Sequence, residues 1–150
     1  MRTLIQKVSR ATIRIDQKEE RSIGAGLLIL LGIEEADGAE DLAWLSGKIS
    51  RLRVFDDEQG VMNLSVKDIG GELMIVSQFT LHASTKKGNR PSYIKAARPE
   101  TAVPLYEAFI RQMKEDTNLR TVSGEFGSYM EVSLTNDGPV TIMIDSKIRE

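Results

Sequence analysis

The segment Ile23–Ile33 most restricts the folds open to this chain. It is a short aliphatic run with flanking glycines and no polar side chain on either face. Such a run is typical of a strand that is buried on both sides. Its start, Gly24-Ala25-Gly26, suggests a dinucleotide fingerprint, but Ile29 stands where the third glycine of that motif is required. We therefore expect a central buried strand and no dinucleotide site.

Several other segments alternate between apolar and polar residues and predict further strands. Leu4–Ile15 alternates loosely and predicts two strands that meet near residues 9 and 10. Glu72–Leu81 predicts one strand, apolar on both faces until Ser77. Alternating residues flank Asn136–Pro139, and this tetrapeptide is typical of the turn of a β-hairpin.

Two segments have helical spacing. Apolar residues between 42 and 52 follow a cap at Asp37 and predict a helix of about 15 residues. A second helix is predicted over Thr101–Lys114, with Pro104 in its first turn and Asn118 ending it. Two helices with about six strands indicate an α+β fold, with a mostly antiparallel or barrel-like sheet. No repeat or linker divides the chain, so we expect one domain over residues 1–150.

Composition excludes several kinds of chemistry. The chain has no cysteine and a single histidine, His82. It therefore has no disulfide, no thiolate nucleophile, no cysteine-based zinc site and no multi-histidine metal site, and we expect neither a metal nor a cofactor. The longest apolar run, Leu27–Leu31, is too short for a membrane span, and the N-terminal segment lacks a signal-peptide pattern, so we expect a cytoplasmic protein.

Charge is unevenly distributed along the chain. The net charge is −2, but the window Lys86–Arg98 contains no acidic residue, so the rest of the chain is clearly acidic. The basic residues of this window are Lys86, Lys87, Arg90, Lys95 and Arg98. A local contact with a polyanion fits this pattern, as does a solvated surface loop.

The most informative polar residues are Ser77, Gln78 and Thr80, because they interrupt an otherwise apolar strand. Buried polar groups without partners are costly, so each needs a hydrogen bond, either to neighbouring backbone or to a ligand. On a strand, Thr80 and His82 would share one face, which makes a Thr80–His82 nucleophile and base pair conceivable. By itself, Asn136–Pro139 indicates only a turn, and a Gly138-Pro139 bond is usually trans.

Several motifs together resemble the D-aminoacyl-tRNA deacylases. Their order and spacing match over essentially the whole chain, and the ordered set is far more specific than any single member. The motifs are Gly26–Gly32, Met62–Val66, Gly70-Gly71, Ser77–Leu81, Lys87–Ser92, Gly124–Gly127 and Asn136–Thr141.

The resemblance implies an enzyme that hydrolyses the ester between a D-amino acid, or achiral glycine, and the 3′ acceptor end of tRNA, a proofreading step in translation. It also implies a homodimer in which a cis Gly138-Pro139 peptide of one subunit enters the active site of the other. The carbonyl oxygens of this motif would hold the substrate amino group so that an L side chain is excluded.

The resemblance also assigns roles to individual residues. The catalytic segment would be Ser77, Gln78, Phe79 and Thr80, with backbone N–H groups near Phe79 and Thr80 holding an oxyanion and Gln78 positioning substrate. Either the tRNA 2′-hydroxyl drives the reaction or Thr80 is the nucleophile, and both remain open. Residues expected to line the substrate pocket are Ala102, Phe126, Gly127 and Met130. Residues expected to contact the tRNA are Lys86, Lys87 and Arg90.

Two positions depart from the family pattern, and two rival functions remain. Lys7 stands where the family commonly has arginine, so a bidentate role there is in question. His82 lies in a variable stretch and receives no catalytic task. The chief rival is a non-catalytic RNA-binding module that uses loop 86–98, and the second is a Thr80–His82 hydrolase of small esters.

Overall fold

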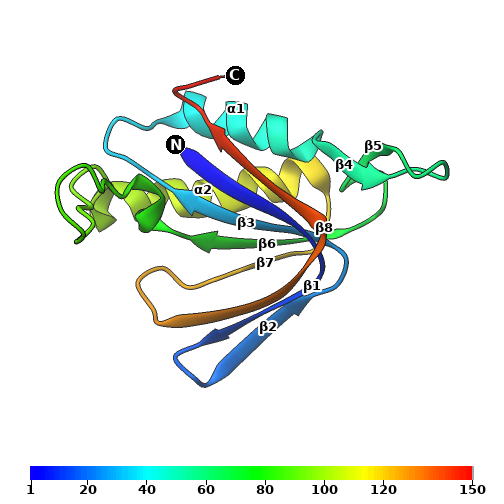
Figure 1. Cartoon of the computed structure of the whole chain (residues 1–150), viewed down its shortest axis with the longest axis horizontal. Helices are drawn as coiled ribbons and strands as arrows, with labels where there is room; N and C mark the ends of the chain where they lie inside the picture. The colour runs from blue at the N-terminus through cyan, green and yellow to red at the C-terminus, as the bar shows by residue number, and fades with distance from the viewer. Residues whose placement is uncertain (150) are drawn as a thin grey trace.

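The structure, a computed structural model, describes residues 1–149 (Figure 1). Its strands are β1 (Arg2–Ile15), β2 (Glu19–Ile23), β3 (Gly26–Gly32), β4 (Arg53–Asp56), β5 (Met62–Ser65), β6 (Glu72–Ser77), β7 (Thr121–Ser123) and β8 (Met130–Asp145). Its helices are α1 (Ala39–Ser50), the short 3₁₀ helix η1 (Phe79–His82) and α2 (Pro99–Thr117). No helix within residues 1–149 is both long and apolar enough to cross a membrane.

Strand β1 organises a mixed, barrel-like sheet. The order is β2-β1-β3-β6-β7, and β8 also pairs with β1. All pairs that involve β1 are antiparallel, whereas β3–β6 and β6–β7 are parallel. The predicted α+β class with a barrel-like sheet is confirmed. The predicted break near residues 9 and 10 is wrong, because β1 continues through that point with only an irregular register opposite β8.

Two separate cores lie on the two faces of β3, as the all-apolar run predicts. Leu27, Ile29 and Leu31 pack in a cluster with α1 and α2, which cover one face of the sheet (Figure 1). Leu28 packs on the other side with residues of β1, β2 and β6, inside the curved sheet. Burial on both faces therefore places β3 at the centre of the molecule.

Both helices begin at other residues than the sequence predicts. The N-cap of α1 is Gly38, because the Asp37 carboxylate instead accepts a hydrogen bond from the Glu34 amide at 2.9 Å and pairs with the Met1 amino group. Helix α2 begins at Pro99, which suits the first helical position, so Pro104 lies inside the helix rather than in its first turn. Asn118 ends α2, as predicted, and the structure shows it in a left-handed conformation.

The predicted hairpin at Asn136–Pro139 is wrong. Residues on both sides of it belong to one strand, β8, whose two halves pair with β1 in the same direction. Val8 pairs with Asn136 and Gln6 with Thr141, so residues 137–140 bulge outward opposite Lys7. The same turn-forming residues can close a hairpin or form a bulge, and the long partner strand β1 selects the bulge here.

Candidate functional site

Strand β6 ends earlier than predicted, and this ending shapes the site. The Gln78 amide donates to the Leu31 carbonyl at 2.7 Å, and the chain then turns into η1. Within that turn, Leu81 N–H donates to the Gln78 carbonyl at 3.2 Å. The prediction of a strand as far as Leu81 is therefore wrong, and Thr80 and His82 do not share a strand face.

A cavity of about 590 Å³ opens where β6 ends. It brings together two predicted motifs that are far apart in the sequence, namely Ser77, Gln78 and Phe79 with the segment Phe126–Met130. Its other lining residues are Val76, Tyr93, Ala96, Ala97, Pro99 and Val132. Ala102 lines a smaller adjoining space of about 20 Å³, together with Ser77, Gln78, Phe79 and Phe126. The lining is mostly apolar with a few polar groups, which is typical of a small-molecule site.

The polar groups at the cavity come from Gln78 and from the start of η1. The Gln78 side-chain amide donates a hydrogen bond to the Thr80 hydroxyl, which itself lies outside the cavity lining. Phe79 and Thr80 are the first residues of η1, so their N–H groups have no acceptor within that helix. Such N–H groups are able to hold an oxyanion.

Gly138 and Pro139 lie away from this cavity in their own chain. They form the exposed outer part of the β8 bulge, and the peptide bond between them is cis. Asn136 closes the bulge, because its side-chain oxygen accepts from the Val140 amide at 2.8 Å and its amide donates to the Thr141 hydroxyl at 2.8 Å. The bulge is therefore built by this chain but does not line the cavity of this chain.

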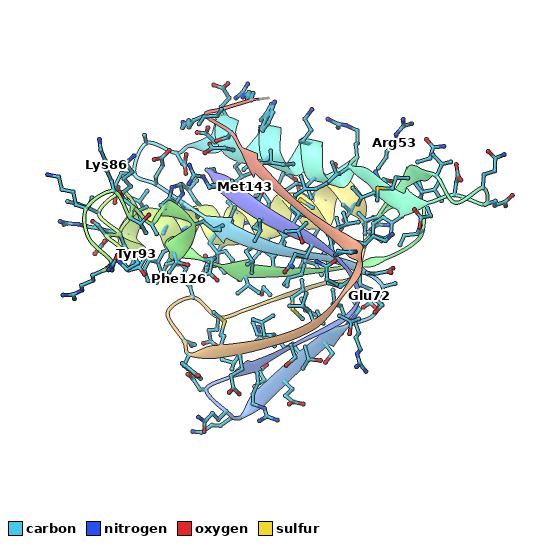
Figure 2. All side chains as sticks on the ribbon, in the orientation of Figure 1. Arg53, Glu72, Lys86, Tyr93, Phe126 and Met143 are labelled. Atoms are coloured by element: carbon cyan, nitrogen blue, oxygen red, sulfur yellow. The ribbon has the colours of Figure 1, made fainter. Side chains whose placement is uncertain are left out.

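The basic loop borders the mouth of the cavity. Lys86, Lys87 and Arg90 are exposed, and none of them lies within 4.0 Å of a carboxylate in the part of the chain that the structure describes. Two hydrogen bonds between Ser84 and Ser92 close the loop. Figure 2 shows Lys86 at the same end of the molecule as Tyr93 and Phe126, both of which line the cavity.

Comparison with known proteins agrees with the motifs on which the resemblance rests. Residues 4–145 match the family model described as D-Tyr-tRNA(Tyr) deacylase. The chain belongs to this deacylase family. It is 58% identical to a D-aminoacyl-tRNA deacylase of Flavobacterium psychrophilum and 57% identical to one of Bacteroides thetaiotaomicron, and each match covers all of both chains. A solved structure titled c-Myc DNA Unwinding Element Binding Protein is 38% identical, with a TM-score of 0.91 over 97% of this chain and 98% of that chain.

Tyr106 supports the backbone beside the cavity, although the sequence indicated only a helix with an apolar stripe. Its buried hydroxyl lies 2.9 Å from the Ile75 carbonyl oxygen and 3.0 Å from that of Gly124, so it links β6 to the segment before Phe126. Burial raises the pKa of Tyr106 to about 12, which keeps the hydroxyl protonated. A tyrosine within an apolar helical stripe is the signal that could have pointed to this link.

The surroundings of Lys7 and His82 indicate structural roles rather than catalytic ones. The Lys7 ammonium is nearly buried and lies 3.7 Å from an Asp56 carboxylate oxygen and 4.0 Å from one of Asp137, so its charge is placed beside the β8 bulge. His82 is buried, its Nε2 atom has no hydrogen-bond partner among residues 1–149, and it does not line the cavity. The geometry therefore gives no support to a Thr80–His82 catalytic pair.

Proposed function

We propose that this chain hydrolyses the ester bond of D-aminoacyl-tRNA and releases free tRNA and the D-amino acid. The observation that carries the proposal is the convergence of Ser77–Phe79 and Phe126–Met130 on one cavity in a member of the deacylase family. Glycine, which has no side chain to exclude, is a second substrate under this proposal. The reaction would serve proofreading in the cytoplasm, where aminoacyl-tRNA is used.

Positioning and charge stabilisation would carry the chemistry. Gln78 would orient the substrate, and the N–H groups of Phe79 and Thr80 would stabilise the negative charge that develops on the ester carbonyl oxygen. The Thr80 hydroxyl already accepts a hydrogen bond from Gln78, and both Thr80 and His82 lie outside the cavity lining. We therefore favour water or the substrate 2′-hydroxyl as the attacking group, with Thr80 as a positioning residue.

A second subunit would complete the site. Gly138 and Pro139 are exposed and lie away from the cavity of their own chain, so they can contribute to a cavity only in another copy. In the proposed homodimer, their carbonyl oxygens bind the substrate amino group and leave room for hydrogen or a D side chain. Discrimination would thus arise by exclusion of the L side chain.

The direct test compares two substrates that differ only in chirality. Purified protein is incubated with D-tyrosyl-tRNA and with L-tyrosyl-tRNA, and the release of the amino acid is followed over time. We expect rapid release from the D substrate and release at the buffer rate from the L substrate. Equal release from both, or none above buffer, would contradict the proposal.

The unpaired cations of the basic loop favour one alternative, a non-catalytic RNA-binding module. One solved relative has a title that describes that protein as a DNA unwinding element binding protein. The two hypotheses differ in turnover, because a binding module would protect D-tyrosyl-tRNA or leave it unchanged. Catalytic release with substrate in excess over protein would exclude the alternative.

A further inference from the structure

Three aromatic side chains that line the cavity are exposed to solvent. Phe79 is 55% exposed, Tyr93 39% and Tyr129 64%, and all three line the cavity. Large exposed aromatic side chains that gather around one opening are characteristic of a binding surface. The hydrolysis proposed above does not use the outer faces of these rings.

Hydrogen bonds hold the backbone of both tyrosines, and the Tyr93 ring contacts that of Phe79. Tyr93 follows the Ser84–Ser92 hydrogen bonds, and its carbonyl accepts from the Ala96 amide at 3.0 Å. Its ring contacts that of Phe79 edge-to-face, with centroids 5.0 Å apart. The backbone of Tyr129 is bonded to Asp16, whose amide donates to the Tyr129 carbonyl at 2.9 Å. The backbone that carries the tyrosine rings is therefore ordered before binding, which reduces the entropy cost of binding.

The charges beside the rings favour an anionic partner. Loop 86–98 has no acidic residue, and its cations have no carboxylate partner within 4.0 Å among residues 1–149, whereas the whole chain has a net charge of −2. Exposed aromatic rings beside unpaired cations match the chemistry of single-stranded nucleic acid, in which bases stack and phosphates need countercharge.

We infer that Tyr93 and Tyr129 form a stacking platform for unpaired bases at the 3′ end of an RNA, while Lys86, Lys87 and Arg90 contact its phosphates. The inference rests on the proposed function for the identity of that RNA, the acceptor end of tRNA. The Phe79 ring contacts that of Tyr93 edge-to-face, and both residues line the cavity. The platform would select substrates by their single-stranded end.

The test measures binding of a short fluorescein-labelled single-stranded RNA ending in CCA, by anisotropy at several salt concentrations. Tyr93→Ala and Tyr129→Ala should each weaken binding by about tenfold and leave the slope of log affinity against log salt unchanged, because stacking releases no counterions. Tyr93→Phe and Tyr129→Phe should bind like the wild type. Lys87→Gln should instead reduce the salt slope.

Two further variants separate stacking from folding and from position. Tyr93→Leu retains an apolar contact with Phe79 but has no flat ring, so it should bind as weakly as Tyr93→Ala. Met62→Ala removes a side chain that is 52% exposed on β5, away from the cavity, and should have no effect. Unchanged affinity in the alanine variants, or weak binding in the phenylalanine variants, would overturn the inference.

The outcome is independent of the test for hydrolysis. RNA binding that depends on the tyrosine rings, in a protein that releases no D-tyrosine, would retain the platform and reject the proposed activity. Selective release of D-tyrosine, together with RNA binding that does not change when either ring is removed, would retain the proposed activity and reject the platform. If Tyr129→Ala changes a dimer into a monomer in light scattering, the ring belongs to an interface between copies, and the platform is rejected.

Discussion

At the scale of single residues, the partner of each polar group shows what it can do chemically. Gln78 and Thr80 were expected as polar interruptions of a buried strand, and the structure pairs them with each other. Tyr106 and Lys7 have equally defined partners, in the Ile75 and Gly124 carbonyls and in the Asp56 and Asp137 carboxylates. The partners of Tyr106 and Lys7 come from distant segments of the chain, so residue type and spacing could not reveal them.

Thr80 gives the sharpest prediction at this scale. Because its hydroxyl accepts a hydrogen bond from Gln78, Thr80→Ala should loosen the Gln78 amide and lower kcat/KM by about tenfold or less, a change of about 1.4 kcal/mol. Gln78→Ala should cost more, since it removes the group that faces the cavity. The measurement is single-turnover hydrolysis of D-tyrosyl-tRNA.

The Thr80 series includes a variant that identifies a nucleophile. Thr80→Ser keeps a hydroxyl, so it should behave like wild type under either mechanism, whereas Thr80→Val keeps the shape and removes the hydroxyl. A loss of several orders of magnitude in both Thr80→Ala and Thr80→Val, restored in Thr80→Ser, would make Thr80 the nucleophile and contradict the positioning role.

At the scale of elements, sequence patterns located the strands and helices better than their ends. The buried strand β3 and the end of α2 at Asn118 were predicted from local chemistry, and both are confirmed. The end of β6 at Ser77 could not be predicted in this way, because the alternation of apolar residues continues past the point where η1 begins. The β8 bulge was also missed, since only pairing with β1 distinguishes it from a hairpin.

Asn136 provides the test of how the β8 bulge is held. Its side chain replaces ladder hydrogen bonds by accepting from the Val140 amide and donating to the Thr141 hydroxyl. Asn136→Ala should therefore let the bulge move and lower the rate with D-tyrosyl-tRNA by about tenfold, with thermal stability reduced by about 1 kcal/mol. Asn136→Asp keeps the acceptor for Val140 and should lie between wild type and alanine. Full activity of Asn136→Ala would show that the bulge needs no such closure.

At the scale of the whole molecule, the barrel-like sheet places the cavity and the bulge apart in one chain. The cavity lies where β6 ends, whereas Gly138 and Pro139 project from β8, which borders β1. No periodicity in the sequence predicts this separation, because it follows from the path of β1 through the sheet. The family resemblance implies that both segments contribute to one site, and the structure places them apart in a single chain.

Mixing two inactive variants tests whether two copies share a site. Gln78→Ala damages the cavity, and Gly138→Val adds bulk at the tip of the bulge; each homodimer should be inactive. After unfolding and refolding an equal mixture, half of the dimers would contain both variants, and each would have one cavity with intact Gln78 facing an intact bulge. Activity should therefore return to about a quarter of the wild-type value per subunit. Light scattering must show dimers in every sample, and a mixture that stays inactive would mean that each chain works with its own bulge or with none.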